Sequence, residues 1–214
     1  MKKNLTSVIT GDIINSRKNT STAKWMSALA KTLNKGGKEQ KDWEIYRGDS
    51  FQLEVKNIED AFLTCIRIKA IIKQFEDLDV RMAIGIGEKT YESPKITQSN
   101  GSAFINSGKT FEKLKKETLM LKSPWAEFDR QMNLLFSLIS QIMDQWTAHS
   151  AEIVMLSLEM PEATQQEIAT KLKITQGRVS ERLKRAAWDQ IVNVDQRFRE
   201  LIKSNKQAGN GTFS

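Results

Sequence analysis

The spacing of apolar residues changes along the chain, and this change constrains the fold more than any other feature. Before about residue 90, strand-like stretches alternate with helical ones, whereas beyond residue 123 only the helical period continues. The strand-like stretches are residues 5–10, 43–46, 51–55 and 80–87, and the helical ones are residues 22–34 and 58–75. This order, β-α-β-β-α-β, predicts an α+β domain over residues 1–122, with a ferredoxin-like sheet that carries helices on one face.

The remainder of the chain is predicted to be an all-α domain over residues 123–204, followed by a flexible tail over residues 205–214. Ser123-Pro124 is typical of a helix start, and an apolar stripe continues from there to about Trp146. Such a stripe belongs either to the core or to a dimer seam, and both interpretations stay open. Further helices are expected near residues 102–116 and 151–158.

The strongest local pattern lies at residues 164–187, TQQEIATKLKITQGRVSERLKRAA. Thr164 and Glu167 have the spacing of a capping box, in which two residues start a helix through reciprocal hydrogen bonds. Ala169 supplies the small side chain that two steeply crossing helices need where they meet. Lys173 stands at a left-handed turn position that usually carries glycine, so we expect about 1 kcal/mol of strain there. The pattern resembles the helix-turn-helix of bacterial regulators and sigma-factor-like domains.

The second helix of such a motif lies in the major groove of DNA, with its N-terminal residues at the base edges. Arg178 has the donors to pair with guanine, and Gln176 has the groups to pair with adenine. Arg182, Lys184 and Arg185 lie further along the helix and are expected to contact phosphates. The full set of expected contacts to double-stranded DNA is Thr175, Gln176, Gly177, Arg178, Ser180, Glu181, Arg182, Lys184 and Arg185. An ordinary three-helix bundle with a basic surface is the alternative.

The distribution of charge points to a polyanionic partner more clearly than the net charge of +7 does. Residues 123–167 hold one basic and seven acidic side chains, whereas residues 168–214 hold ten basic and four acidic ones. Six of those ten basic residues lie between Lys171 and Arg185, within the helix-turn-helix pattern. A solvated helix face is the alternative interpretation of this cluster.

Rare residues exclude several classes of protein. The single cysteine and single histidine exclude a disulfide framework and metal sites built from these residues. No run of 18 apolar residues exists, so no transmembrane helix is expected, and the N-terminal stretch does not have the pattern of a signal peptide. We therefore expect a cytoplasmic protein.

Two aspartates of the first half are candidates for a metal or nucleotide site. Asp12 follows the first predicted strand, and Asp49 lies in the predicted hairpin loop. In a ferredoxin-like sheet these strands are neighbours, so we expect both carboxylates at one sheet edge. Two close carboxylates can hold Mg²⁺ against nucleotide phosphates. Gly-Asp pairs are also common in turns, so turn capping remains open as the alternative role.

The same segments resemble the catalytic core of class III nucleotide cyclases and GGDEF-type proteins. The matching segments are Gly11-Asp12-Ile13, Gly48-Asp49-Ser50-Phe51 and Ile84-Gly85-Ile86-Gly87. The resemblance implies Mg²⁺ and a nucleotide at Asp12 and Asp49. In cyclases a later helix carries an asparagine and an arginine that stabilise the transition state. Those positions fall on Ile105 and Lys109 here, so cyclase catalysis is not expected.

Four longer segments of the chain carry a further resemblance, namely TGDIINSRK at residues 10–18, IYRGDSFQLEV at 45–55, RMAIGIGEKT at 81–90 and NGSAFINSGKTFEKLK at 100–115. Together they look like the SatD family of bacterial proteins. With the helix-turn-helix pattern, the resemblance extends through nearly the whole chain, and it implies an architecture and a regulatory role without a known substrate.

We therefore predict a DNA-binding transcriptional regulator whose first domain serves sensing or dimerisation. The alternative is a Mg²⁺-dependent nucleotide-binding or nucleotide-processing enzyme of the cyclase-like type. A third possibility is a structural homodimer module that uses the same domains without DNA.

Overall fold

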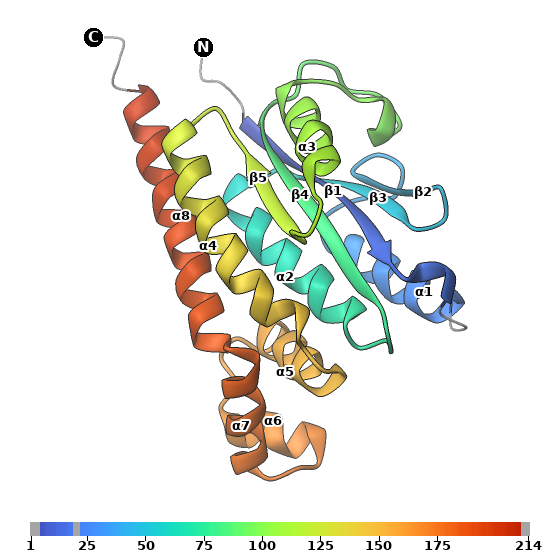
Figure 1. The fold of residues 1–214 in the computed structure, drawn as a ribbon, viewed down its shortest axis with the longest axis vertical. Coiled ribbons are helices and arrows are strands. Elements are labelled where there is room, and N and C mark those ends of the chain that lie inside the picture. The colour runs from blue at the N-terminus through green and yellow to red at the C-terminus, as the bar shows by residue number, and fades with distance from the viewer. Residues whose placement is uncertain (1–4, 19–21, 211–214) are drawn as a thin grey trace.

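The first part of the chain has the predicted order of strands and helices. The structure is a computed structural model that describes residues 5–18 and 22–210 (Figure 1). Its first six main elements are β1 (Leu5–Ile14), α1 (Thr22–Leu33), β2 (Trp43–Tyr46), β3 (Ser50–Val55), α2 (Ala61–Ile72) and β4 (Asp79–Glu88). Short 3-10 turns lie at Ser16–Lys18, Ile58–Asp60 and Ile96–Gln98.

These strands form a five-stranded mixed sheet in the order β2-β3-β1-β4-β5. The central strand β1 runs antiparallel to both β3 and β4. The fifth strand, β5 (Leu119–Lys122), pairs in parallel with the edge of β4 and was not predicted. It has only four residues, and its pairing joins segments more than 30 residues apart, so local spacing carries little signal for it.

Strand β1 is longer than predicted, because it continues past residue 10 through Gly11 and Asp12. Both neighbouring strands pair with this extension, and Asp12 lies opposite Ser50 on one side and Arg81 on the other. A Cβ atom on Gly11 would lie 2.3 Å from Cζ of Phe51, so the glycine leaves room for that ring. Asp12 is therefore a residue of the sheet and does not follow the strand.

The sheet is covered on both faces, whereas the sequence indicated helices on one. Helices α1 and α2 pack on one face, and α3 (Ser102–Lys113) covers the other (Figure 1). Two glycines of β4 allow α3 to approach closely. A Cβ atom on Gly85 would lie 2.2 Å from the carbonyl oxygen of Ala103, and one on Gly87 would lie 2.4 Å from Oγ of Ser102.

The rest of the described chain is helical. Its elements are α4 (Ala126–Asp144), α5 (Ala148–Glu159), α6 (Gln165–Leu172), α7 (Gln176–Ala186) and α8 (Trp188–Asn210). Helix α4 ends two residues before Trp146, and α5 begins three residues earlier than predicted. Helix α8 was not predicted, and it includes residues 205–210 of the expected tail. Residues 211–214 of that tail lie outside the described residues.

One apolar core extends from the sheet into the helical region. Its centre is an aromatic cluster in which the ring of Phe62 on α2 lies 4.7 Å from Phe136 on α4 and 6.0 Å from Phe198 on α8, between centroids. These three rings are almost fully buried, and they join three helices that are distant in sequence. Between residues 22 and 210, no helix is both long and apolar enough to cross a lipid bilayer.

Candidate functional site

Helices α6 and α7 are joined by the three residues from Lys173 to Thr175. The predicted capping box at the start of α6 is confirmed. The backbone N–H of Thr164 donates to Oε2 of Glu167 over 2.7 Å, and the backbone N–H of Glu167 donates back to Oγ1 of Thr164 over 3.3 Å. The backbone N–H and the hydroxyl of Thr164 both donate to the Glu167 carboxylate, and these two hydrogen bonds, the backbone one above all, lower its pKa.

The turn between the two helices has the expected left-handed residue. Lys173 adopts φ 55° and ψ 42°, a conformation that glycine adopts with less strain. The following N–H of Ile174 donates to the carbonyl of Ala169 over 3.0 Å, which closes the end of α6. Ala169 and Val179 are fully buried between the two helices, as the spacing indicated. The turn geometry is therefore retained although lysine replaces glycine.

The outer face of α7 is accessible. Of the nine expected DNA contacts, all except Arg182 are exposed. Thr175 caps the helix, because its hydroxyl accepts the backbone N–H of Arg178 over 3.3 Å. The guanidinium of Arg178 has no hydrogen-bond or ion-pair partner within the described ranges. Nε2 of Gln176 donates to Oε1 of Gln165 over 2.7 Å, which joins the first turns of the two helices.

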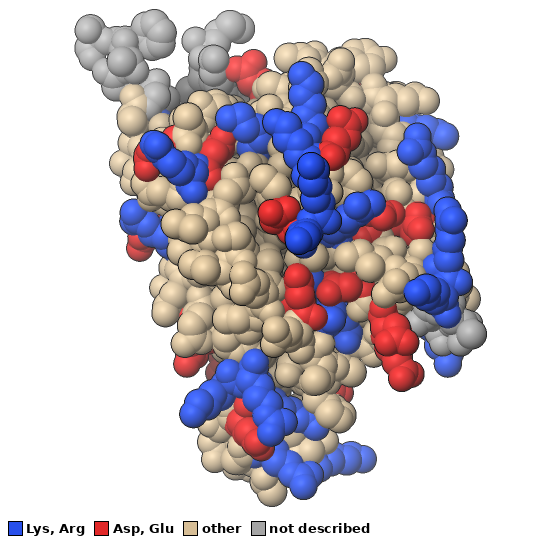
Figure 2. Space-filling model, viewed as in Figure 1, with Lys and Arg blue, Asp and Glu red and all other residues tan. Residues whose placement is uncertain are grey.

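Two arginines of α7 are paired with acidic residues of the same chain. Arg182 is 19 % exposed and lies 3.0 Å from Oε2 of Glu152 on α5, so its guanidinium points back to the protein. Arg185 pairs with Glu181 over 2.6 Å on the exposed surface. Figure 2 shows Lys and Arg gathered with few acids at the end of the molecule that α6 and α7 form. The ion pair of Arg182 is a feature that the spacing did not reveal.

The C-terminal end of α7 is fixed to the helical region by a buried hydrogen bond. Nε1 of Trp146, in the turn between α4 and α5, donates to the carbonyl oxygen of Ala186 over 3.1 Å. The next residue, Ala187, adopts the left-handed conformation at φ 53° and turns the chain into α8. The position of α7 therefore depends on the turn that follows α4.

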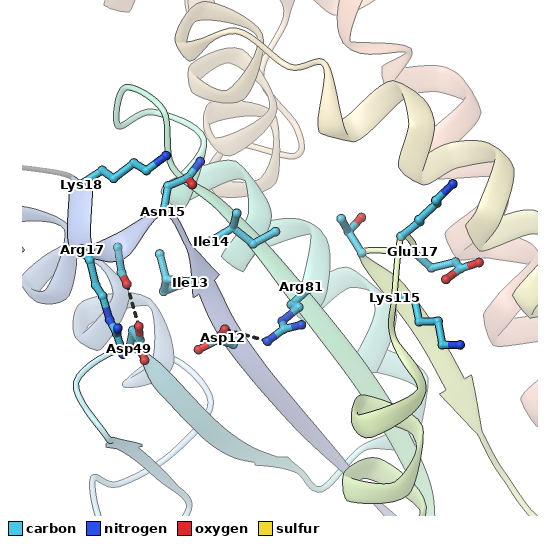
Figure 3. Close-up of a pocket in the computed structure, with 13 residues that line it drawn as sticks. Asp12, Ile13, Ile14, Asn15, Arg17, Lys18, Asp49, Arg81, Lys115 and Glu117 are labelled. Atoms are coloured by element: carbon cyan, nitrogen blue, oxygen red, sulfur yellow. Dashed lines mark hydrogen bonds and ion pairs between the residues drawn. The ribbon is translucent and has the colours of Figure 1, made fainter.

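Asp12 and Asp49 line one pocket of about 580 Å³ at the end of β1 (Figure 3). The structure thus brings the two predicted aspartates to the same site. The carboxylate of Asp12 accepts a hydrogen bond from Ser50 over 3.2 Å and pairs with Arg81 over 3.2 Å. The carboxylate of Asp49 accepts the hydroxyl of Ser16 over 2.6 Å.

The positions and contacts of Asp12 and Asp49 show whether either residue could cap a turn. Asp12 lies within β1 and interacts across the sheet, so turn capping is the wrong role for it. Asp49 lies in the turn between β2 and β3, where its carbonyl oxygen accepts the N–H of Ile13 over 3.1 Å. Across the described ranges, no three His, Cys, Asp or Glu side chains are grouped as a metal site would need.

Basic side chains that the sequence did not single out also line this pocket. After β1, Arg17 lies beside Asp49 and Lys18 lies beside Asn15, and Lys115 lies across the pocket in the connection from α3 to β5 (Figure 3). Arg81 lies between these two sides, with its guanidinium 5.1 Å from the ring centroid of Phe111. Each side contains two adjacent basic residues in the sequence, Arg17-Lys18 and Lys115-Lys116, but nothing local indicates that the two pairs meet at one pocket.

The comparisons with known proteins agree with this architecture. The family model described as SatD family matches residues 7–202, which includes the sheet, the pocket and both helices of the candidate interface. No curated protein and no solved structure matches the chain significantly.

Proposed function

The chain belongs to the SatD family, and on that premise we propose that it is a transcriptional regulator that binds double-stranded DNA through α6 and α7. The observation that carries the proposal is the outer face of α7, on which Arg178 is exposed and has no partner among the residues that the structure describes. The turn at Lys173 supports the assignment of a helix-turn-helix. A protein that regulates transcription in this way would bind DNA in the cytoplasm.

The exposed residues of α7 suggest separate roles at DNA. Arg178 would pair bidentately with guanine, and Gln176 would leave Gln165 to pair with adenine. Lys184 and Arg185 would contact phosphates, because they lie nearer the end of the helix. Thr175, Gly177, Ser180 and Glu181 complete the proposed contact face, and Arg182 would reach phosphate only if it gave up Glu152.

The first domain would serve sensing or dimerisation. Its strands β2, β3, β1 and β4 have the order of a ferredoxin-like sheet, with β5 added at the edge, which supports the cyclase-like assignment. A homodimer is supported by the outer face of α4, where Leu134, Leu138 and Ile142 are exposed at intervals of four residues. No charged residue occurs from residue 131 to residue 143, and a two-fold interface can therefore form there without like charges meeting.

The experiment that tests this function is selection of bound DNA from a random pool by the full chain. We expect enrichment of a short motif, and a binding constant that falls steeply with added salt because lysine and arginine displace counterions. Failure to enrich any sequence, together with weak binding that does not depend on salt, would contradict the proposal.

A second function is favoured by one observation, namely that Asp12 and Asp49 line the same pocket. In this alternative the pocket holds Mg²⁺ and a nucleotide, as the cyclase-like resemblance implies. The test is thermal stabilisation by nucleotide with Mg²⁺, which should disappear in Asp12→Asn and in Asp49→Asn. Equal stabilisation of these variants and the wild type would exclude a role for the carboxylates.

A further inference from the structure

The pocket at the end of β1 carries more positive than negative charge. Its lining contains five basic and three acidic side chains, which are Arg17, Lys18, Arg81, Lys115 and Lys116 against Asp12, Asp49 and Glu117. The two kinds of charge also differ in their surroundings, because the acidic groups have donors from the protein, whereas most of the basic groups have no acidic partner among the described residues.

Each acidic group of the pocket is engaged by the protein itself. Asp12 is held by Ser50 and Arg81, and Asp49 is held by Ser16. Glu117 receives hydrogen bonds from backbone N–H groups of its own loop, which lower the pKa of its carboxyl. These carboxylates therefore do not need an added cation to satisfy them.

The basic groups are in the opposite situation. Within the part of the chain that the structure describes, Arg17, Lys18, Lys115 and Lys116 have no acidic partner within 4.0 Å. Nε of Arg81 is buried and has no acceptor. Of these cations, Arg17 and Lys18 lie on one side of the pocket and Lys115 lies on the other side, beyond Arg81 (Figure 3), so basic groups flank the pocket on both sides.

We propose that this pocket binds a phosphate-bearing small molecule directly through its basic side chains, and that the bound molecule alters the DNA-binding helix α7. A volume of about 580 Å³ is within the range of small-molecule sites. Phosphate is the class of ligand that accepts several charge-assisted hydrogen bonds from lysine and arginine at once. The ligand site and the response of α7 do not depend on the proposed function, whereas the description of α7 as a DNA-binding helix rests on it.

A short polar path joins the pocket to α7. Thr118 lines the pocket, and its hydroxyl donates to Oδ1 of Asp144 over 2.7 Å. Asp144 is the last residue of α4, and the turn that follows contains Trp146, whose indole donates to Ala186 at the end of α7. A ligand that moves the loop of residues 115–118 therefore acts on the turn that positions α7.

The ligand site is tested by calorimetry on the full chain, with inorganic pyrophosphate as the probe in a buffer that contains a chelator. We expect saturable binding, which Lys115→Ala with Lys116→Ala weakens about tenfold or more, because two charge-assisted hydrogen bonds are lost. The matched control is Lys109→Ala with Lys113→Ala, which removes two exposed lysines of α3 outside the pocket. Binding that requires Mg²⁺, equal weakening in both double variants, or no binding at all would each overturn the site.

The connection to α7 is tested without DNA, so its result is independent of the proposed function. Hydrogen exchange of the amides of residues 176–186 should change when pyrophosphate is added to the wild type. At a pyrophosphate concentration that saturates each variant, Thr118→Val should lose this change, and Thr118→Ser, which keeps the hydroxyl, should retain it. The connection is refuted if α7 exchanges at the same rate with and without bound pyrophosphate, or if Thr118→Val responds as the wild type does.

If α7 responds but the chain binds no DNA, the proposed function fails and the ligand-dependent change stands. If the chain binds DNA but pyrophosphate has no site, the proposed function stands and the present inference fails.

Discussion

The ammonium group of Lys69 on α2 is ion-paired with the carboxylate of Asp144, the last residue of α4. The same ammonium lies 2.6 Å from Asp79 at the start of β4, and the Lys69 side chain is only 2 % exposed. This buried cation therefore joins the sheet to the helical region, directly beside the turn that positions α7.

Loss of the Lys69 cation should lower the free energy of unfolding. Lys69→Met would leave the carboxylates of Asp79 and Asp144 near each other without their shared partner, and breaking a buried pair in this way costs about 3–5 kcal/mol. Urea unfolding measures the difference in the free energy of unfolding. Arg130→Met is the control, because it breaks an exposed pair with Glu127 and should change stability by less than about 1 kcal/mol. Similar losses in the two variants would contradict a structural role for Lys69.

Replacement of Lys173 by glycine should stabilise the protein by up to about 1 kcal/mol, because the left-handed backbone of this residue strains any side chain with a Cβ atom. The matched control is Lys171→Gly in the helical part of α6, which should destabilise by about 1 kcal/mol. Thermal or urea unfolding of both variants shows whether each substitution raises or lowers the free energy of unfolding. A loss of stability in Lys173→Gly would show that the lysine side chain stabilises the turn by more than the strain costs.

Arg178 and Arg182 should differ at DNA although they lie one turn apart on α7. Arg178→Ala should weaken binding to a selected site by about 1–3 kcal/mol and relax its preference at one base pair. Arg182→Ala should have a smaller effect on DNA and should also lower stability, because it breaks the pair with Glu152. Gel-shift titrations and unfolding of the same variants separate these effects. Unchanged affinity in Arg178→Ala would remove its role in reading bases.

Stability should fall in acid partly through Asp42. Burial raises the pKa of this carboxyl, but the N–H of Lys38 and the ammonium of Lys56 outweigh burial, and the net pKa lies below the ordinary value. A lowered pKa in the folded state stabilises the protein above the ordinary pKa of about 4, and this contribution disappears as the pH falls through the lowered value. The advantage of the wild type over Asp42→Asn should therefore shrink between pH 5 and about pH 2.

Urea unfolding at several pH values measures this difference. Asp189→Asn, an exposed carboxylate in the first turn of α8, is the control for the change in net charge. A difference between the wild type and Asp42→Asn that stays constant across this range would contradict the assignment.

The outer face of α4 should mediate self-association. Leu134 and Leu138 are 63 % and 57 % exposed, and Leu138→Glu would place two like charges together at a two-fold interface. We expect sedimentation to show a dimer for the wild type and a monomer for this variant. Ile105→Glu, at an exposed apolar residue of α3, is the control. A monomeric wild type, or a dimer that Leu138→Glu leaves intact, would place the interface elsewhere or exclude it.

Much of the local structure was predictable because its signals lie within a few residues. The capping box of Thr164 and Glu167 depends on a spacing of three, and the buried faces of α6 and α7 depend on the helical period. Helix α8 carried the same kind of signal, since Ile191, Phe198 and Ile202 are buried at helical spacing, but the polar residues at the end of the chain mask this signal. Strand β5 had no comparable local signal.

By itself, the sequence determined the order of the first six main elements, the two helices around Lys173 and the concentration of positive charge on α7, because hydrophobic period and charge are local properties. Only the tertiary structure decided what the charged groups of the pocket contact. Pairing between strands places Asp12 beside Arg81, and the same pocket receives Lys115 from a distant loop. Helix packing likewise places Glu152 against Arg182 and Asp144 against Lys69. Such contacts depend on how separate segments bury their apolar faces together, and no local spacing in the chain encodes them.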